Sequence, residues 1–294
     1  MQNKPDTAAI KQSLVEVEDV KFRAEGGFKA VYEATISGIK EALKVIFIPE
    51  ENGQTELRAE MSARVKREIE SLRILTSPYV VKLGSLVPHA CKIDRHEYLV
   101  YSEEFLAGPT LRDRLRSRHQ PSFDECQALF RCLLQVIAEL KSNNLIHRDI
   151  NPNNIVALGS DRRPFVMLDL GIAFKLYSTP ITLNPEMRQG TLPYMAPEMF
   201  QPHFREMLDY RSDLYSAAVT VYEYAAGIHP IARRDENDFT TMYRIVRMKP
   251  TPLVQYRPDL PASFCQMIDQ MIRKKPALRP SNIGLLLNQL EMMA

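Results

Sequence analysis

The hydrophobic pattern of the chain changes near residue 105, and this change limits the folds that the chain can adopt. Before that point most apolar residues lie in short runs rich in β-branched and aromatic residues, which predict strands. These runs cover residues 20–24, 30–35, 41–48, 80–87 and 97–102. One segment, 55–75, interrupts them with apolar residues at helical spacing, so we expect a single helix among the strands.

From residue 110 onward helical patterns dominate. The clearest helical segments are residues 123–143, 212–226, 238–248, 262–274 and 283–292. A small hairpin is expected where the apolar runs 155–158 and 165–168 flank a turn-forming segment. Strands followed by helices predict an α+β fold with two packed lobes.

Three segments with different roles are expected along the chain. Residues 1–17 contain little apolar surface and predict a flexible tail. Residues 18–105 predict the small β-rich lobe with one helix, and residues 106–294 predict the larger, mostly helical lobe. The hinge between the lobes is expected at residues 104–108.

The composition favours a soluble cytoplasmic protein. The 294 residues include 38 Lys and Arg against 36 Asp and Glu, so no basic field indicates nucleic acid or an anionic membrane as partner. The N-terminus lacks the apolar core of a signal peptide. The most apolar later run, 214–228, is short and contains Glu223, which indicates a buried helix. Four cysteines without a C-x-x-C pair are typical of a reducing compartment.

Two motifs in the second half of the chain carry the chemistry of phosphoryl transfer. The first is His147-Arg148-Asp149-Ile150-Asn151-Pro152-Asn153-Asn154, and the second is Asp169-Leu170-Gly171. They resemble the H-R-D catalytic loop and the D-F-G metal motif of the eukaryotic-like serine/threonine protein kinase family. The resemblance covers about residues 20–292, and implies the two-lobed protein kinase fold with ATP and Mg²⁺, or Mn²⁺ in its place, as cofactors.

The resemblance assigns a role to each polar residue of these motifs. Asp149 is expected to orient the substrate hydroxyl and to accept its proton. Asn154 and Asp169 are expected to ligate the metal ion through oxygen, which Mg²⁺ prefers.

The β-rich lobe matches the nucleotide-binding part of the same family. Residues 24–32 resemble the glycine-rich loop, with Gly26 and Gly27 expected near the phosphates. Lys44 is expected to contact the α- and β-phosphates and to pair with Glu68 from the following helix. The adenine contacts expected from the family pattern are Val31, Ala42 and Val156, together with Glu104 and Leu106 in the hinge.

Several positions depart from the family pattern. Ala24 and Lys29 replace two glycines of the loop, and Asn151 replaces a lysine that contacts the γ-phosphate. We hypothesise that Lys29 leans over the phosphates and partly supplies the missing cation; the alternative is a solvated loop lysine. Glu103 falls at the back of the adenine pocket, and a carboxylate there needs a partner if it is buried.

Residues 190–198 resemble the end of a protein kinase activation segment and favour a protein substrate. In this family Glu198 is expected to pair with Arg279, and Asp213 to brace the catalytic loop. Arg148 before Asp149 is typical of kinases that activation-loop phosphorylation switches on, by an upstream kinase or by the chain itself. Candidate phosphorylation sites are Ser178, Thr179 and Thr182, and the alternative is constitutive activity.

Other interpretations remain open at this point. Asn151, Ala24 and Lys29 favour a pseudokinase that scaffolds or regulates a partner, and a small-molecule kinase is a third possibility. The alternating arginines at 112, 114, 116 and 118 predict either an acidic-substrate dock or a solvated face. The segment from His89 to His96 matches no usual zinc spacing and is expected as a loop between strands.

Overall fold

The computed structural model describes residues 4–26, 29–48, 55–170, 174–175, 190–202 and 204–293. The described chain divides into two units. The sheet unit comprises the described residues of 1–74 and 81–107, and the helical unit comprises those of 75–80 and 108–294.

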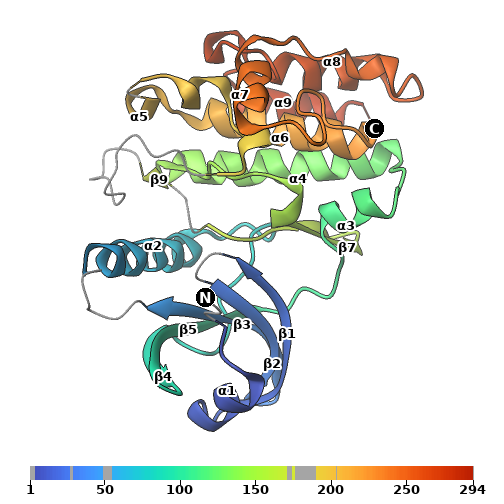
Figure 1. Ribbon diagram of the computed structural model, residues 1–294. Helices are drawn as coiled ribbons and strands as arrows, with labels where there is room; N and C mark the ends of the chain where they lie inside the picture. The colour runs from blue at the N-terminus through green and yellow to red at the C-terminus, as the bar shows by residue number, and fades with distance from the viewer. Residues whose placement is uncertain are drawn as a thin grey trace. The chain divides into compact units, whose positions relative to one another are not determined.

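Five antiparallel strands form the sheet unit in the order β1-β2-β3-β5-β4 (Figure 1). Their bounds are β1 Val17–Gly26, β2 Lys29–Ile36, β3 Ile39–Ile48, β4 His89–Ile93 and β5 His96–Glu104. Side chains alternate between the two faces of a strand, so each face buries its own set of residues. One face buries Tyr32, Leu43 and Val100, and the other buries Ile46 and Tyr101 against α2 (Thr55–Ile74).

A helix covers the face of the sheet opposite α2, and it lies in the segment that was expected to be a flexible tail. Residues 7–13 form α1 (Thr7–Ser13), which begins at the N-cap Asp6. Ile10 of α1, Leu14 at its C-cap and Val17 at the start of β1 are all buried with the sheet residues. The hydroxyl of Tyr32 also donates to the carbonyl of Pro5 at 2.7 Å. The prediction of a flexible tail is therefore wrong for residues 4–17.

The segment 80–87, expected as a strand, takes part only in isolated bridges at Val80 and Leu83. Its backbone bonds in part to the backbone of Ser102 and Glu104 and in part to side chains, since Ser85 N–H donates to the Glu41 carboxylate at 2.8 Å and Leu86 N–H to Ser102 Oγ at 2.9 Å. Gly84 permits this approach, because a Cβ there would meet Glu41 Oε2 at 2.4 Å. The neighbouring segment expected as a loop forms β4 instead.

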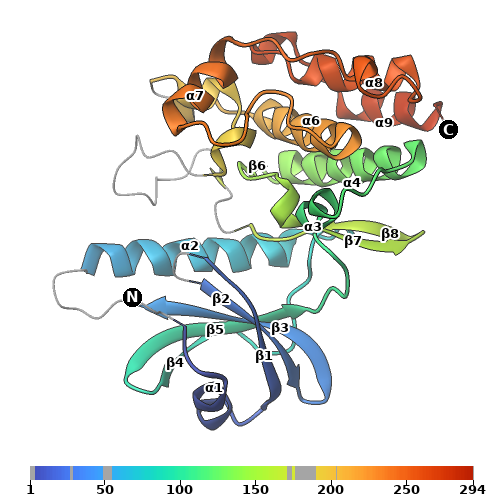
Figure 2. The same cartoon turned by 45° about the vertical axis from the view of Figure 1, so that its right-hand side comes forward.

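Long helices build the helical unit (Figure 2). Its α-helices are α3 Leu111–Arg116, α4 Phe123–Ser142, α5 Phe204–Met207, α6 Tyr210–Ala226, α7 Asp238–Arg247, α8 Ala262–Met271 and α9 Ile283–Glu291. The hairpin β7 (Ile155–Ser160) and β8 (Arg163–Met167) is confirmed, and β6 (Leu145–Ile146) pairs with β9 (Phe174–Lys175). Among the described residues no helix is long and apolar enough to cross a membrane.

Helix α6 forms the centre of this unit because it is buried on every side. All its residues from Ser212 to Ala225 are buried. A capping box at Ser122 and Glu125 begins α4, whose apolar face includes the buried Leu133 and Ile137. The polar groups that α6 carries into the core therefore need partners inside the protein.

Replacing Ile10 by Ala tests the packing of α1. Because Ile10 is fully buried against the sheet, we expect the free energy of unfolding to fall by about 2–5 kcal/mol. Urea unfolding measures the change, with the exposed neighbour substitution Lys11→Ala as control. Equal stability of the two variants would mean that α1 does not belong to the core.

Candidate functional site

The expected site residues fall into three groups. The sheet unit holds Gly26, Lys29, Val31, Ala42, Lys44, Glu68, Glu104 and Leu106. The helical unit holds Asp149, Asn154, Val156 and Asp169. Gly27, Ser178, Thr179 and Thr182 lie outside the described residues. We therefore describe the two halves of the site one after the other.

Asp213 of α6 fixes the backbone at the start of the catalytic loop, as expected. Its carboxylate accepts the N–H groups of His147 at 2.8 Å and Arg148 at 2.9 Å. The carboxyl is fully buried, and this burial raises its pKa, although nearby His147 and the two backbone hydrogen bonds act in the opposite direction. Arg148 adopts φ of 69°, a left-handed conformation that a non-glycine residue rarely takes. The loop is thus held in an unusual conformation from inside the core.

The carboxylate of Asp149 is oriented through both of its oxygens. The side-chain amide of Asn154 donates to Oδ2 at 2.9 Å, and the backbone N–H of Thr191 donates to Oδ1 at 2.8 Å. Thr191 belongs to the segment that the sequence identified as the end of the activation segment. A carboxylate held in this way can accept or orient the proton of a hydroxyl.

Asn151 is a structural part of the loop. It is buried, and its amide donates to Asp149 O at 3.0 Å and to Thr191 Oγ1 at 3.2 Å. Its amide oxygen accepts the backbone N–H of Asn153 at 2.9 Å. The residue that replaces the usual lysine therefore joins the catalytic loop to Thr191 with neutral hydrogen bonds.

Asn154 and Asp169 form the candidate metal-binding pair. The backbone N–H of Leu168, next to Asp169, donates to Asn154 O at 2.7 Å. Since the Asn154 amide nitrogen faces Asp149, its oxygen is the atom available to a hard cation. No group of three or more His, Cys, Asp and Glu that could hold a metal occurs in the described part of the chain. An Asn–Asp pair fits a Mg²⁺ ion that takes its remaining oxygens from water and phosphate.

Glu198 and Arg279 form the buried ion pair that the sequence predicted. Two parallel hydrogen bonds of 2.6 and 2.8 Å join the guanidinium to the carboxylate, and Ser212 Oγ adds a third at 2.7 Å. The guanidinium also lies 4.9 Å from the ring centre of Tyr215. Such a pair stabilises one geometry strongly, because removing either partner leaves a buried charge uncompensated.

Sequence reasoning missed a second polar network beside Glu198. Tyr194 donates its hydroxyl proton to Glu223 of α6, and Arg112 pairs with the same carboxylate at 3.0 Å. Arg114 likewise pairs with Glu125 at 2.8 Å. Arg116 lies 3.5 Å from Asp113, so three of the four alternating arginines form ion pairs within the protein. The only signal in the sequence was a single glutamate inside the most apolar run.

His229 lies against Tyr194 in the same region, with ring centres 5.2 Å apart. Its Nδ1 accepts the backbone N–H groups of Ile231 at 3.1 Å and Ala232 at 2.8 Å, which requires an unprotonated nitrogen. Burial lowers the pKa of His229 from 6.5 to about 4; nearby Arg112 acts in the same direction and Glu223 against it. The imidazole is therefore neutral at physiological pH.

In the sheet unit Lys44 pairs with Glu103, which corrects the partner expected for it. Nζ of Lys44 lies 3.0 Å from Oε2 of Glu103, and both side chains are buried. The sheet register explains this pair, because Ala42 faces Glu103 across β3 and β5, so Glu103 lies diagonally from Lys44 on the same face. The expected partner Glu68 lies instead 3.6 Å from Nζ of Lys29.

Glu104 at the end of β5 is bound through its backbone and its side chain to Lys82. Its N–H donates to Lys82 O at 2.9 Å, and its carboxylate accepts Lys82 N–H at 2.8 Å. Val31 faces Lys44 directly across β2 and β3, and Ala42 precedes Lys44 by two residues on the same face of β3. The adenine contacts expected of these residues and of Leu106 stay predictions.

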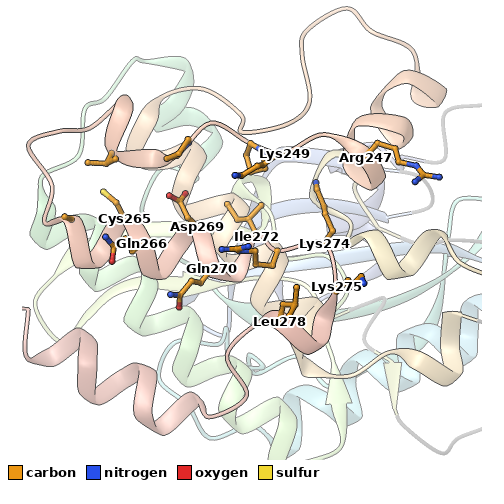
Figure 3. A pocket seen from close by; sticks show the side chains of 15 residues that line it. Arg247, Lys249, Cys265, Gln266, Asp269, Gln270, Ile272, Lys274, Lys275 and Leu278 are labelled. Atoms are coloured by element: carbon orange, nitrogen blue, oxygen red, sulfur yellow. The ribbon is translucent and has the colours of Figure 1, made fainter.

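A cavity of about 740 Å³ in the helical unit is lined by residues of α7, α8 and the segments beside them. Figure 3 shows Asp269, Lys249 and Lys274 in its lining. Lys274 donates to Ile245 O at 2.7 Å, and burial lowers its pKa to about 8. None of the lining residues belongs to the catalytic loop, so this cavity is not part of the candidate site.

Comparisons with known proteins agree with this geometry. Residues 22–290 match the family described as the protein kinase domain. A probable serine/threonine-protein kinase of Clostridium perfringens is 24% identical over 91% of the chain, and serine/threonine-protein kinase PknD of Mycobacterium tuberculosis is 28% identical over 90%. Serine/threonine-protein kinase 1 of Arabidopsis thaliana is 26% identical over 94%. The chain matches only 36%, 38% and 31% of the lengths of these relatives, respectively.

The protein should lose stability in acid through His229. An unfolded histidine takes up a proton near pH 6.5 and the folded one only near pH 4, so the free energy of unfolding should fall by roughly 3 kcal/mol between these values. Chemical unfolding at several pH values measures this loss, and His229→Gln should remove most of it. The same pH dependence in wild type and variant would assign the acid sensitivity to other groups; His89→Gln in the sheet unit is the control.

Proposed function

Because the chain belongs to the protein kinase domain family, we propose that it is an ATP-dependent serine/threonine protein kinase. It transfers the γ-phosphate of ATP to serine or threonine hydroxyls of protein substrates, and autophosphorylation and regulation by an upstream kinase or another partner are part of the proposal. Residues 18–294 act as one catalytic domain. The names of the relatives support the serine/threonine class.

One observation carries the proposal most directly. The carboxylate of Asp149 receives one hydrogen bond from the candidate metal ligand Asn154 and another from Thr191 of the activation segment. A phosphoryl-transfer site needs these three functions close together: a carboxylate for the hydroxyl, a ligand for the cation and a segment beside the substrate.

Each residue of the loop has a defined task in the proposed reaction. Asp149 orients the attacking hydroxyl and accepts its proton as the bond to the γ-phosphorus forms and the bond from that phosphorus to the β-phosphate oxygen breaks, so that ADP leaves. Asn154 and Asp169 would hold Mg²⁺, which would offset the negative charge of the phosphates. The loop backbone on Asp213 keeps Asp149 in place, because preorganised groups need no rearrangement during the reaction.

The sheet unit supplies the cation that contacts the α- and β-phosphates in this proposal. Lys29 and Lys44 lie on the same face of the sheet, and each is paired with a buried carboxylate. Gly26 is the last residue of β1 and belongs to the segment that resembles the glycine-rich loop, and a glycine there lets the backbone approach phosphate closely.

Replacing Asp149 by Ala should lower phosphate transfer by about 10²- to 10⁴-fold, because the hydroxyl loses its proton acceptor. The measurement is transfer of labelled γ-phosphate from ATP with Mg²⁺ or Mn²⁺, to the chain itself and to a basic generic protein, with the labelled amino acid identified. The matched control is Asp161→Ala, an exposed aspartate in the turn between β7 and β8.

Label on serine or threonine that disappears only in Asp149→Ala would support the proposal. No label from a folded wild-type chain that binds ATP would contradict it and favour a pseudokinase. Label that persists in Asp149→Ala would remove the proposed role of this residue.

A further inference from the structure

The cavity beside α7 and α8 has no task in the proposed function, and its lining resembles that of a ligand site. Its volume of about 740 Å³ lies in the range of sites that bind small molecules. Such sites are lined mainly by apolar side chains, and a few polar groups orient the ligand. The apolar lining residues here are Pro250, Pro252, Val254, Ala262, Ile272 and Leu278.

The charges in this lining are strongly unequal. Asp269 is acidic, and five lining residues are basic, namely Arg247, Lys249, Arg273, Lys274 and Lys275. Within the part of the chain that the structure describes, no ion pair joins any of the five to a carboxylate. The carboxylate of Asp269 accepts the N–H of Leu253 at 3.2 Å, and burial raises its pKa. The cavity is therefore suited to an anion.

Lys274 carries one of the positive charges toward the interior. Its side chain is only partly exposed, and its Nζ donates to Ile245 O at 2.7 Å, in the last turn of α7, where a cation is favourable. Burial lowers the pKa of Lys274 to about 8, and nearby Arg279 acts in the same direction. An anion bound beside this ammonium group would offset both effects.

The basic residues and the neutral residues lie toward different ends of the cavity. In Figure 3 Cys265 lies at one end of the lining, and burial raises the pKa of its thiol to about 11, so this end is uncharged at neutral pH. Arg247, Lys274 and Lys275 lie toward the other end. Ile272 lies between the two ends. A matching ligand is apolar at one end and negatively charged at the other.

The elements that line the cavity favour a small molecule over an extended peptide. Residues 247–278 contain helices and turns but no strand, and all of them are described. The cavity thus has no sheet edge that could bind the backbone of a peptide. An alkyl chain has no backbone polar groups that need partners, and it can enter an apolar cavity without this cost.

We propose that this cavity binds a small amphipathic anion, an alkyl chain that carries a phosphate or carboxylate group. The chain packs over Ile272 toward Cys265, and the anionic group lies beside Lys274 and Lys275. The ligand is a dissolved single-chain molecule, because the site is a cavity of small-molecule size. This site goes beyond the proposed function, since binding to it requires neither ATP nor phosphate transfer.

Calorimetric titration with alkyl phosphates tests the apolar part of the proposal. The probes are hexyl, octyl and decyl phosphate below their micelle concentrations, with inorganic phosphate as the head group alone. We expect the affinity to rise about fourfold for each added methylene that enters the cavity. Decyltrimethylammonium, which has the same chain and the opposite charge, should bind at least about tenfold more weakly than decyl phosphate.

A pair of double variants tests the basic part. Lys249→Glu/Lys275→Glu reverses two exposed charges that form no ion pair among the described residues, so we expect the fold to persist. The dissociation constant of decyl phosphate should increase by about tenfold or more. The matched control Lys66→Glu/Lys92→Glu reverses two exposed lysines of the sheet unit and should stay within about twofold of wild type.

Thermal unfolding separates specific binding from detergent action. Decyl phosphate that binds the folded protein should raise the unfolding temperature of the wild type, and raise it less in Lys249→Glu/Lys275→Glu. A lower unfolding temperature, or an equal loss of affinity in both double variants, would overturn the inference. Inorganic phosphate that binds as tightly as decyl phosphate would also overturn it, because the apolar part would then have no role.

Two further probes distinguish other partners of the same charge. The first is an acidic peptide that contains leucine, and the second is a vesicle of phosphatidylcholine and phosphatidate. Binding of either one without saturable binding of decyl phosphate would overturn the inference. A chain that transfers phosphate but does not bind decyl phosphate would support the kinase activity alone, and one that binds it without transferring phosphate would support this site alone.

Discussion

The buried carboxylate of Asp213 is the constraint on which the catalytic loop depends. A carboxylate inside a helix that is buried on every side is costly unless donors reach it. The donors are the backbone N–H groups of His147 and Arg148, which reach Asp213 in the observed conformation of the loop. The left-handed φ of Arg148 shows that the loop accepts local strain in return. The core therefore determines where Asp149 lies.

Other buried carboxylates in the protein follow the same principle. Glu198 joins the end of the activation segment to Arg279, Glu223 joins α6 to Arg112, and Glu103 joins β5 to Lys44. Glu41 holds the irregular segment at Ser85 by its backbone. Each carboxylate connects parts of the chain that are far apart in sequence. Because a buried acid without a partner is strongly unfavourable, each connection selects one arrangement over its alternatives.

Strong local signals explain which parts of the fold could be predicted from the sequence. Helices α4 and α7 begin at the predicted residues, because Ser122 and Asn237 cap them and their apolar faces are regular. Helix α1 was missed because it is short, and its apolar residues stand out only against the sheet that they cover. The strand at 89–93 was missed because the alternative at 80–87 is richer in β-branched residues, and Gly84 and Glu41 decide between them.

The candidate site divides in a similar way. Asp149, Asn154 and Asp169 could be proposed from the sequence because their chemistry requires these residue types at a fixed spacing. The pairs Glu198–Arg279 and Asp213 with the loop backbone followed from the same resemblance. The partner of Lys44 could not be predicted in this way, because it depends on the register of β3 and β5, and a pattern along the chain does not report which side chains face each other across strands.

The carboxylate of Asp149 is oriented by uncharged groups, and this affects how the site responds to salt. The groups that orient this carboxylate are the amide of Asn154 and the backbone N–H of Thr191, and Asn151 joins the same segments. None of these groups carries a charge. Dissolved ions screen interactions between charges over about 8 Å at physiological ionic strength, so they have little effect on these hydrogen bonds. A rise in salt concentration should weaken the encounter with charged ligands, while the alignment of Asp149 itself stays the same.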